Sequence, residues 1–266
     1  MSIKSKVILL IGPNQHHFST AKILIEKKVY ISGIVVADKK SAGINLNFLK
    51  IILKKHGIVK VFFQILERVF YKFLNSKKDK NIYNKLFPKN DKNIVINSLK
   101  SDQIIFVTDY DKVEVSDLIL KQKPDFIIIH TPFWVSKKIR DLVGGRVLGG
   151  HPGITQKYRG IHSPFWAIYN NDLKNIGYTV FWVTNGVDSG EIIDQGFIKP
   201  NKDDSYISLS WRGMKEIALS LPRIIKKYEY SNEIVSKKNN SISKNTLYYH
   251  PTIFNYIYYR YKSNVR

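Results

Sequence analysis

One histidine and one aspartate have the surroundings expected of a site for acyl transfer. His151 lies in Val147-Leu-Gly-Gly-His-Pro-Gly-Ile-Thr-Gln-Lys-Tyr-Arg-Gly160, and Asp188 lies in Gly186-Val-Asp-Ser-Gly-Glu-Ile-Ile193. Transfer of an acyl group to an amine needs stabilisation of a developing oxyanion and a base that removes a proton from the amine. His151 therefore suits either donation to the oxyanion, when protonated, or transfer of protons, and Asp188 suits removal of the proton from the amine.

The surrounding pattern predicts an α/β domain that brings these two loops together. Apolar runs predict strands at 6–11, 30–37, 104–107, 125–130, 146–149, 177–183 and 192–199. Helices are expected at 19–28, 113–122, 136–143, 163–170 and 209–228. Strands that alternate with helices form a mostly parallel sheet covered on both faces, and loops at the carboxyl ends of its strands form the ligand crevice.

Two segments lie outside this pattern. Residues 41–100 form a basic insertion containing an amphipathic helix, whose apolar face consists of Val59, Phe62, Phe63, Leu66, Val69, Phe70 and Phe73. We predict that this face docks on the core of the protein, with a membrane interface or a partner helix as alternatives.

We assign residues 1–205 to the catalytic domain and residues 206–266 to a C-terminal helix and an aromatic-rich extension. The extension is expected to end in a short hairpin, with stacking on a nucleotide base as the alternative.

Charge is distributed unevenly along the chain. The net charge is +22, of which residues 41–100 contribute +10 (13 basic, 3 acidic) and residues 212–266 contribute +8 (11 basic, 3 acidic). Such a field favours anionic partners, including phosphorylated substrates and phospholipid surfaces, although solvated lysines alone also explain it. The chain has no cysteine and no apolar run of about 18 residues that would span a bilayer. We expect a cytoplasmic protein, peripheral to the inner membrane face if the insertion binds lipid.

The order and spacing of several short motifs resemble the folate-dependent formyltransferase family. These motifs are the His151 segment, Phe165-Trp-Ala167, Gly177-Tyr-Thr179 and the Asp188 segment. The resemblance implies a Rossmann-like fold, 10-formyltetrahydrofolate as formyl donor, and a primary amine as acceptor. It also implies that His151 and Asp188 correspond to the catalytic histidine and aspartate of the family.

The chain departs from the family pattern at Gly149, where the resemblance predicts an asparagine that donates to the oxyanion. Loss of one such donor typically costs about 10²–10³ in rate. Three explanations remain open: another group replaces the amide, the acceptor or acyl donor differs, or the chain is a weak relative. The candidate replacements are the side chains of His130, Thr131 and Asn185 and the backbone N–H groups of Gly149 and Gly150.

The resemblance also assigns residues to binding roles. The formyl donor is expected to contact His130, Thr131, Pro132, Phe133, Trp134, Asn185 and Gly186. The acceptor is expected to contact Gly12, Pro13, Asn14, Gly149, Gly150, Tyr158, Arg159 and Gly160, the first three holding a phosphate at a helix N-terminus. We expect no metal site, because His16 and His17 have no matching ligand cluster in the sequence and are expected to cap the helix or face solvent.

These observations favour an N-formyltransferase acting on a nucleotide-linked amino sugar or another small phosphorylated amine. A formyl-folate hydrolase and a catalytically weakened binding protein are the alternatives that use the same fold. An enzyme like methionyl-tRNA formyltransferase would need a further RNA-binding domain, so nucleic acid is not the expected partner. A homodimer is compatible with the sequence.

Overall fold

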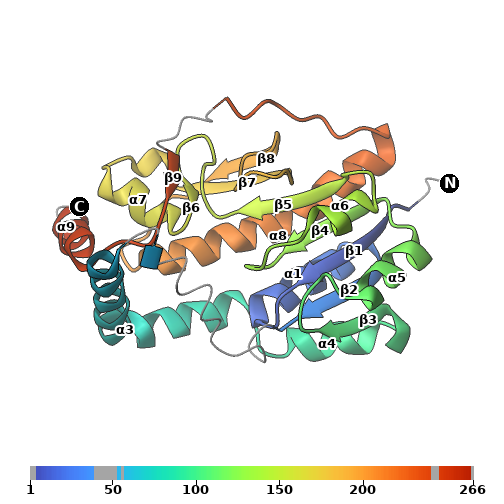
Figure 1. Cartoon of the computed structure of the whole chain (residues 1–266), viewed down its shortest axis with the longest axis horizontal. Coiled ribbons are helices and arrows are strands. Elements are labelled where there is room, and N and C mark those ends of the chain that lie inside the picture. The colour runs from blue at the N-terminus through green and yellow to red at the C-terminus, as the bar shows by residue number, and fades with distance from the viewer. Residues whose placement is uncertain (1–3, 39–52, 55–56, 241–245, 265–266) are drawn as a thin grey trace.

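A seven-stranded sheet forms the centre of the fold, and the predicted His151 site lies where one of its inner strands ends. The computed structural model describes residues 4–38, 53–54, 57–240 and 246–264. The strand order is β3-β2-β1-β4-β5-β7-β8, with β1 to β5 parallel and β7 antiparallel to both of its neighbours (Figure 1). The strands are β1 (Lys6–Ile11), β2 (Tyr30–Ala37), β3 (Ile104–Val107), β4 (Phe126–His130), β5 (Val147–His151), β7 (Gly177–Trp182) and β8 (Ile192–Phe197).

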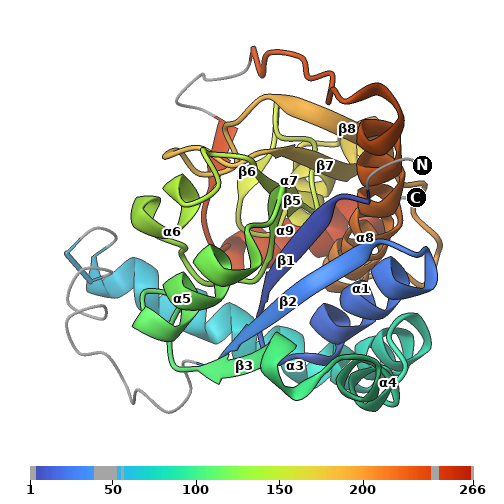
Figure 2. The same ribbon diagram turned by 90° about the vertical axis from the view of Figure 1, so that its right-hand side faces the viewer.

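Helices cover both faces of this sheet, as the sequence predicts (Figure 2). On one face, α1 (Gln15–Glu26) and α8 (Tyr206–Ser231) pack on the sheet around Leu9, Leu148 and Ile217. On the other face, α5 (Val113–Gln122) and α6 (Lys137–Asp141) enclose a second core around Ile8 and Val147. This alternation of neighbouring residues between two cores is the reason why the strands are almost continuously apolar.

Most predicted elements lie within a few residues of the observed ones. Helix α1 begins four residues before its predicted start at residue 19, because Asn14 caps it and His17 belongs to its first turn. Helix α8 lies on the sheet through Ile217, Leu221 and Ile225, so packing continues across the boundary that we expect near residue 205. The division of the chain into domains stays a prediction.

Helix α3 (Ile58–Leu86) contradicts the prediction that its apolar face docks on the core. The described side chains of this face are largely exposed, Phe62 by 55% and Phe73 by 83%, whereas the buried residues of the helix are Gln64, Glu67, Tyr71 and Asp79. These inward polar groups have partners: Glu67 accepts a hydrogen bond from Tyr206, and Asp79 accepts one from Tyr71. The helix is therefore held by a buried polar network and presents its apolar face outward. Residues 39–52, the first part of the predicted insertion, lie outside the described residues.

The chain end also differs from its prediction. A helix, α9 (Ile253–Asn264), stands where a hairpin was expected, because Tyr256 and Tyr259, three residues apart, share one buried face. Tyr259 stacks on Phe165 of α7 (Ser163–Tyr169), and their ring centroids are 4.8 Å apart. These two tyrosines serve as core residues.

The remaining elements connect these layers. They are α4 (Asp91–Ser98), the 3₁₀ turns at Ser101–Gln103 and Leu173–Asn175, and the two-stranded pair β6 (Arg159–Gly160) and β9 (Leu247–Tyr248). A search of the described helices finds none with the length and apolar character required to cross a bilayer.

The buried carboxyl group of Glu67 yields a prediction for pH-dependent stability. Burial raises its pKa above the ordinary value, so the folded state disfavours the charged form. Stability associated with this group is present at low pH and is lost as the pH rises through the raised pKa. We expect Glu67→Gln to gain stability relative to the wild type between pH 4.5 and 7.5, measured by urea denaturation. A stability difference that is independent of pH would contradict this account.

Candidate active site

His151 is the last residue of β5, and both of its ring nitrogens have partners. Nδ1 lies 3.3 Å from Oδ2 of Asp188. Nε2 lies 2.6 Å from Oγ of Ser163 and 2.9 Å from the carbonyl oxygen of Tyr158. The imidazole side chain is only 6% exposed. The end of β5 thus fixes the position of the ring, and its contacts with Ser163 and Tyr158 fix its orientation.

Asp188 reaches this ring from the connection between β7 and β8. Its Oδ2 also accepts a hydrogen bond of 3.0 Å from the backbone N–H of Gly160. Gly160 has a φ of +88°, and a Cβ atom there would lie 2.4 Å from the carbonyl oxygen of Tyr248, so only glycine fits. The Asp188 side chain is 20% exposed, which makes it the member of the pair that solvent reaches more readily.

Hydrogen-bond directions define the role of Nε2 of His151. The Tyr158 carbonyl oxygen only accepts, and Ser163 donates from Oγ to that same oxygen at 2.9 Å, so Nε2 is the donor toward both groups. Nδ1, on the other side of the ring, faces the carboxylate of Asp188. The ring is therefore held in one orientation between a hydroxyl and a carboxylate.

The position of the missing asparagine is sterically closed. Gly149 lies inside the sheet, paired with Ile129 on one side and Phe181 on the other. A Cβ atom on Gly149 would lie 2.7 Å from Cγ2 of Val183. Because its backbone belongs to two ladders, Gly149 is a poor replacement donor, and any amide must come from another segment.

Asn185 is the side-chain amide among the candidates. Its Oδ1 accepts a hydrogen bond of 2.7 Å from Arg140 of α6, which fixes the side chain and turns its NH₂ group away from the guanidinium. Asn185 lies in the same short connection as Val183 and Asp188. The sequence included Asn185 among the candidates but did not indicate Arg140, whose guanidinium is buried beside a loop that is distant in sequence.

The segment after β4 presents part of the predicted donor pocket. Trp134 is 59% exposed, and the guanidinium of Arg140 lies 5.9 Å from its ring centroid. Phe133 is partly buried against the second core, and Thr131 accepts a hydrogen bond from the N–H of Phe133. Pro132 lies between them, and Gly186 forms a tight turn in which a Cβ atom would meet Ser189. The His130 ring, in contrast, packs against the start of α1.

Several predicted acceptor residues have internal partners. Tyr158 donates to Asp172, and Arg159 donates to Thr246 and to the carbonyl of Val187. A Cβ atom on Gly150 would lie 2.5 Å from Ile217 of α8.

The space at the turn of Gly12, Pro13 and Asn14 is occupied by the side chain of His17. A Cβ atom on Gly12 would lie 2.5 Å from the ring of His17. The backbone N–H of Asn14 donates to Nδ1 of that ring at 3.2 Å. Of the two alternatives for these histidines, capping is confirmed for His17, which belongs to the capping box of α1, and exposure to solvent is wrong, since His16 and His17 are both buried.

Ser163 contacts His151 but is not among the residues that the sequence indicates. It lies three residues beyond Gly160, at the start of a predicted helix beside Pro164, and that position is the available signal. A cavity of about 1190 Å³ lies between α3, α7 and α9, and neither His151 nor Asp188 lines it. Cavity size therefore does not mark the site, which is defined by paired polar groups.

Comparison with known proteins agrees with this geometry. A formyl transferase family model matches residues 71–225, more than half of the chain. The chain belongs to the formyl transferase family. A stretch of 87 residues is 33% identical to methionyl-tRNA formyltransferase of Finegoldia magna, but it spans only 28% of that relative and 32% of this chain.

Solved structures of formyl transferases share the fold at low sequence identity. Phosphoribosylglycinamide formyltransferase of Bacillus halodurans superposes with a TM-score of 0.55 at 13% identity, covering 89% of this chain and all of that one. A sugar N-formyltransferase from a Shewanella species gives a TM-score of 0.55 at 12% identity, covering 97% of this chain and 87% of that one. At these identities the likeness establishes the mostly parallel sheet with flanking helices.

The formyl donor of this family is 10-formyltetrahydrofolate, and the residues present fit such a molecule. Nε of Arg140 is a buried donor without a hydrogen-bond partner in the described part of the chain. It lies beside the exposed ring of Trp134. A flat aromatic surface next to an unsatisfied cationic donor suits a pterin and its polar edge.

The closed space at Gly149 predicts the result of restoring the family asparagine. Gly149→Asn forces the new side chain against Val183, and overpacking of this kind costs about 1–3 kcal/mol. We expect reduced stability in urea denaturation and recovery of most of the loss in Gly149→Asn with Val183→Ala. A single variant as stable as the wild type would show that the space is open.

Proposed function

We propose that this formyl transferase is an active N-formyltransferase that moves a formyl group from 10-formyltetrahydrofolate to a primary amine of a small phosphorylated acceptor. A nucleotide-linked amino sugar is the acceptor that we favour. The observation that carries the proposal is the contact between His151 and Asp188 at the edge of the sheet, held by the N–H of Gly160. A paired imidazole and carboxylate supply the charge stabilisation and the proton acceptance that the reaction needs.

Each residue has one role in the proposed reaction. The neutral amine attacks the formyl carbon of the donor. Asp188, the more exposed member of the pair, accepts the amine proton through a water molecule. His151, held between Asp188 and Ser163, stabilises negative charge as it develops on the formyl oxygen, and the NH₂ group of Asn185 donates to the same oxygen. Collapse of the tetrahedral adduct then breaks the bond between the formyl carbon and the donor nitrogen, which takes up a proton, and tetrahydrofolate leaves.

Two observations support a phosphorylated small-molecule acceptor. The exposed ionisable side chains are predominantly basic, in keeping with the net charge of +22, and such a field raises the local concentration of anionic substrates. The fold likeness to a sugar N-formyltransferase extends over 97% of this chain, including its C-terminal part. We place the reaction in the cytoplasm.

Substitution of the three polar groups tests these roles. We expect Asn185→Ala to lower kcat by about 10²–10³, as for removal of one oxyanion donor. Asp188→Asn is expected to lower kcat by about 10²–10⁴, as for loss of a general base. His151→Ala should be at least as impaired. The measurement is steady-state release of tetrahydrofolate with a panel of amino-sugar nucleotides, and Asn97→Ala on α4 is the matched control.

The same assay separates the alternatives. Release of tetrahydrofolate that is independent of acceptor would identify a formyl-folate hydrolase. Tight binding of the donor without turnover would identify a binding protein. Transfer that survives His151→Ala unchanged would refute the assigned role.

The outward face of α3 supports a peripheral membrane location for this enzyme. Both acidic residues of α3, Glu67 and Asp79, are buried, so every exposed Asp, Glu, Lys or Arg on the helix is basic. Exposed apolar residues lie beside them and continue to Phe254 of α9, whose ring centroid is 4.7 Å from that of Phe63. Apolar side chains flanked by lysines fit an anionic phospholipid surface better than a second copy of this strongly basic chain.

Removal of two outward phenylalanines tests this location. We expect the wild type to co-sediment with phosphatidylglycerol vesicles, less so in high salt, and weakly with phosphatidylcholine. Burial of one phenylalanine contributes about 1.5–3 kcal/mol, so Phe62→Ser with Phe73→Ser should weaken binding more than tenfold. The exposed control pair is Val113→Ser with Val235→Ser. Unchanged binding, or a double variant that instead loses a dimer in sedimentation velocity, would contradict the membrane assignment.

A further inference from the structure

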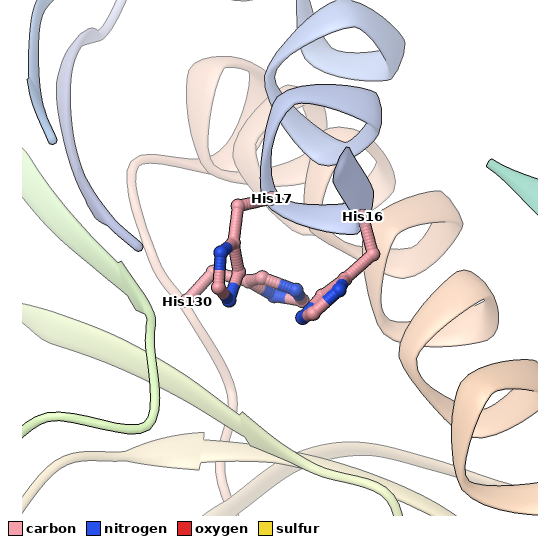
Figure 3. A group of neighbouring side chains, drawn as sticks. All are labelled: His16, His17 and His130. Carbon is pink, nitrogen blue, oxygen red and sulfur yellow. The ribbon is translucent and has the colours of Figure 1, made fainter. Parts of the chain in front are cut away.

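Three histidine rings meet at the carboxyl ends of β1 and β4, next to the crevice of the sheet. His16 and His17 lie in the first turn of α1, and His130 ends β4. Their ring centroids are 3.9 Å apart for His16 and His17, 5.8 Å for His16 and His130, and 5.3 Å for His17 and His130. The three rings turn toward one shared space (Figure 3), where one nitrogen of each lies within 4.8 Å of the other two.

The cluster is buried and has no acidic partner. His17 is 2% exposed, and His16 and His130 are each 9% exposed. Across the described residues, no carboxylate forms a hydrogen bond or ion pair with any of the three rings. A buried imidazole that carried a positive charge would need a carboxylate beside it to balance that charge, and the described residues supply none.

The geometry brings one nitrogen of each ring into the shared space. A neutral imidazole has one unprotonated nitrogen, and this is the form that ligates metal ions.

Neighbouring groups orient two of the rings from outside the cluster. Nδ1 of His16 lies 3.0 Å from Oη of Tyr83, which also accepts the backbone N–H of His16 at 3.1 Å. Thr20 donates to the carbonyl of His16, so toward His130 its oxygen acts only as an acceptor, at 3.5 Å. Outer partners of this kind fix the tautomer of metal-binding histidines.

His17 has an outer partner in Asn14. Its Nδ1 accepts the N–H of Asn14 at 3.2 Å, which places the ring proton on Nε2. Ligation through Nε2 therefore requires the other tautomer and gives up the contact with Asn14.

We propose that His16, His17 and His130 bind a divalent transition-metal ion, with zinc as the best match. Three imidazole nitrogens without a thiolate suit zinc, which often keeps a fourth position for water or a substrate group. Magnesium and calcium prefer oxygen ligands. In a tetrahedral site with Zn–N bonds of about 2.0–2.1 Å, the ligand nitrogens lie roughly 3.4 Å apart. The rings must therefore close by roughly 1 Å.

The site would change the acceptor side of the crevice. The turn at Gly12–Asn14 is filled by the His17 ring, which leaves little room for a phosphate held by backbone N–H groups. A bound dication at this place supplies positive charge and an exchangeable ligand position for an anionic or hydroxyl group. It would also tie the start of α1 to the end of β4. The site shares no residue with the His151–Asp188 pair, so metal binding is tested apart from the proposed formyl transfer.

Metal binding is measured directly on the full chain, freed of metal by a chelator. Zn²⁺ is titrated against a chromogenic competitor, and X-ray absorption of the loaded protein reports the ligand shell. We expect one equivalent of Zn²⁺ with three imidazole ligands. Tyr83→Phe, which removes only an outer partner of His16, is expected to weaken binding by about 10–100-fold. Substitution of His16, His17 or His130 by Asn should weaken binding further.

Matched controls are Tyr230→Phe on the surface and His250→Gln outside the cluster, and both should bind Zn²⁺ like the wild type. Circular dichroism verifies the fold of each variant. If the Asn variants unfold, Tyr83→Phe against Tyr230→Phe still decides the question. No tight equivalent of Zn²⁺, a shell of oxygen ligands, or equal affinity in the cluster variants and controls would overturn the proposal.

Discussion

One carboxylate oxygen, Oδ2 of Asp188, joins the segments on which the site depends. It contacts Nδ1 of His151 at the end of β5 and accepts the N–H of Gly160 in β6. Both contacts need unusual backbone: Asp188 has a φ of +48° and Gly160 a φ of +88°. Conformations of this kind persist when the surrounding structure determines them, and they are frequent at functional sites. The antiparallel pair β7–β8 supplies that support.

The same connection between β7 and β8 accounts for the departure from the family pattern. Val183 occupies the space beside Gly149, and Asn185, two residues later, is held by Arg140. The closed space at Gly149 and the held amide of Asn185 thus belong to one connection of the chain. The proposal that Asn185 supplies the amide rests on this arrangement.

The sequence predicts the sheet well because its strands are continuous apolar runs and its motifs lie at strand ends. The contact of His151 with Asp188 does not follow from the rule for parallel strands, because β7 is antiparallel to β5 and the connection that carries Asp188 leaves β7 beside Val147. The face of α3 could not be predicted from periodicity, because its buried side is polar and is stabilised by Tyr206 and Ser205, more than a hundred residues away. The histidine cluster was missed for a related reason. Adjacent His16 and His17 gave no ligand spacing, and His130 joins them only through the pairing of β1 with β4.

The most direct measurement of the central claim follows the formyl carbon itself. The protein is incubated with 10-formyltetrahydrofolate labelled at that carbon and with amino-sugar nucleotides, and the products are separated by mass. We predict that the label appears on the acceptor nitrogen with the wild type and is nearly absent with Asp188→Asn. Label found only in formate, or equal transfer by both proteins, would contradict the assignment of His151 and Asp188 as the centre of a formyl-transfer site.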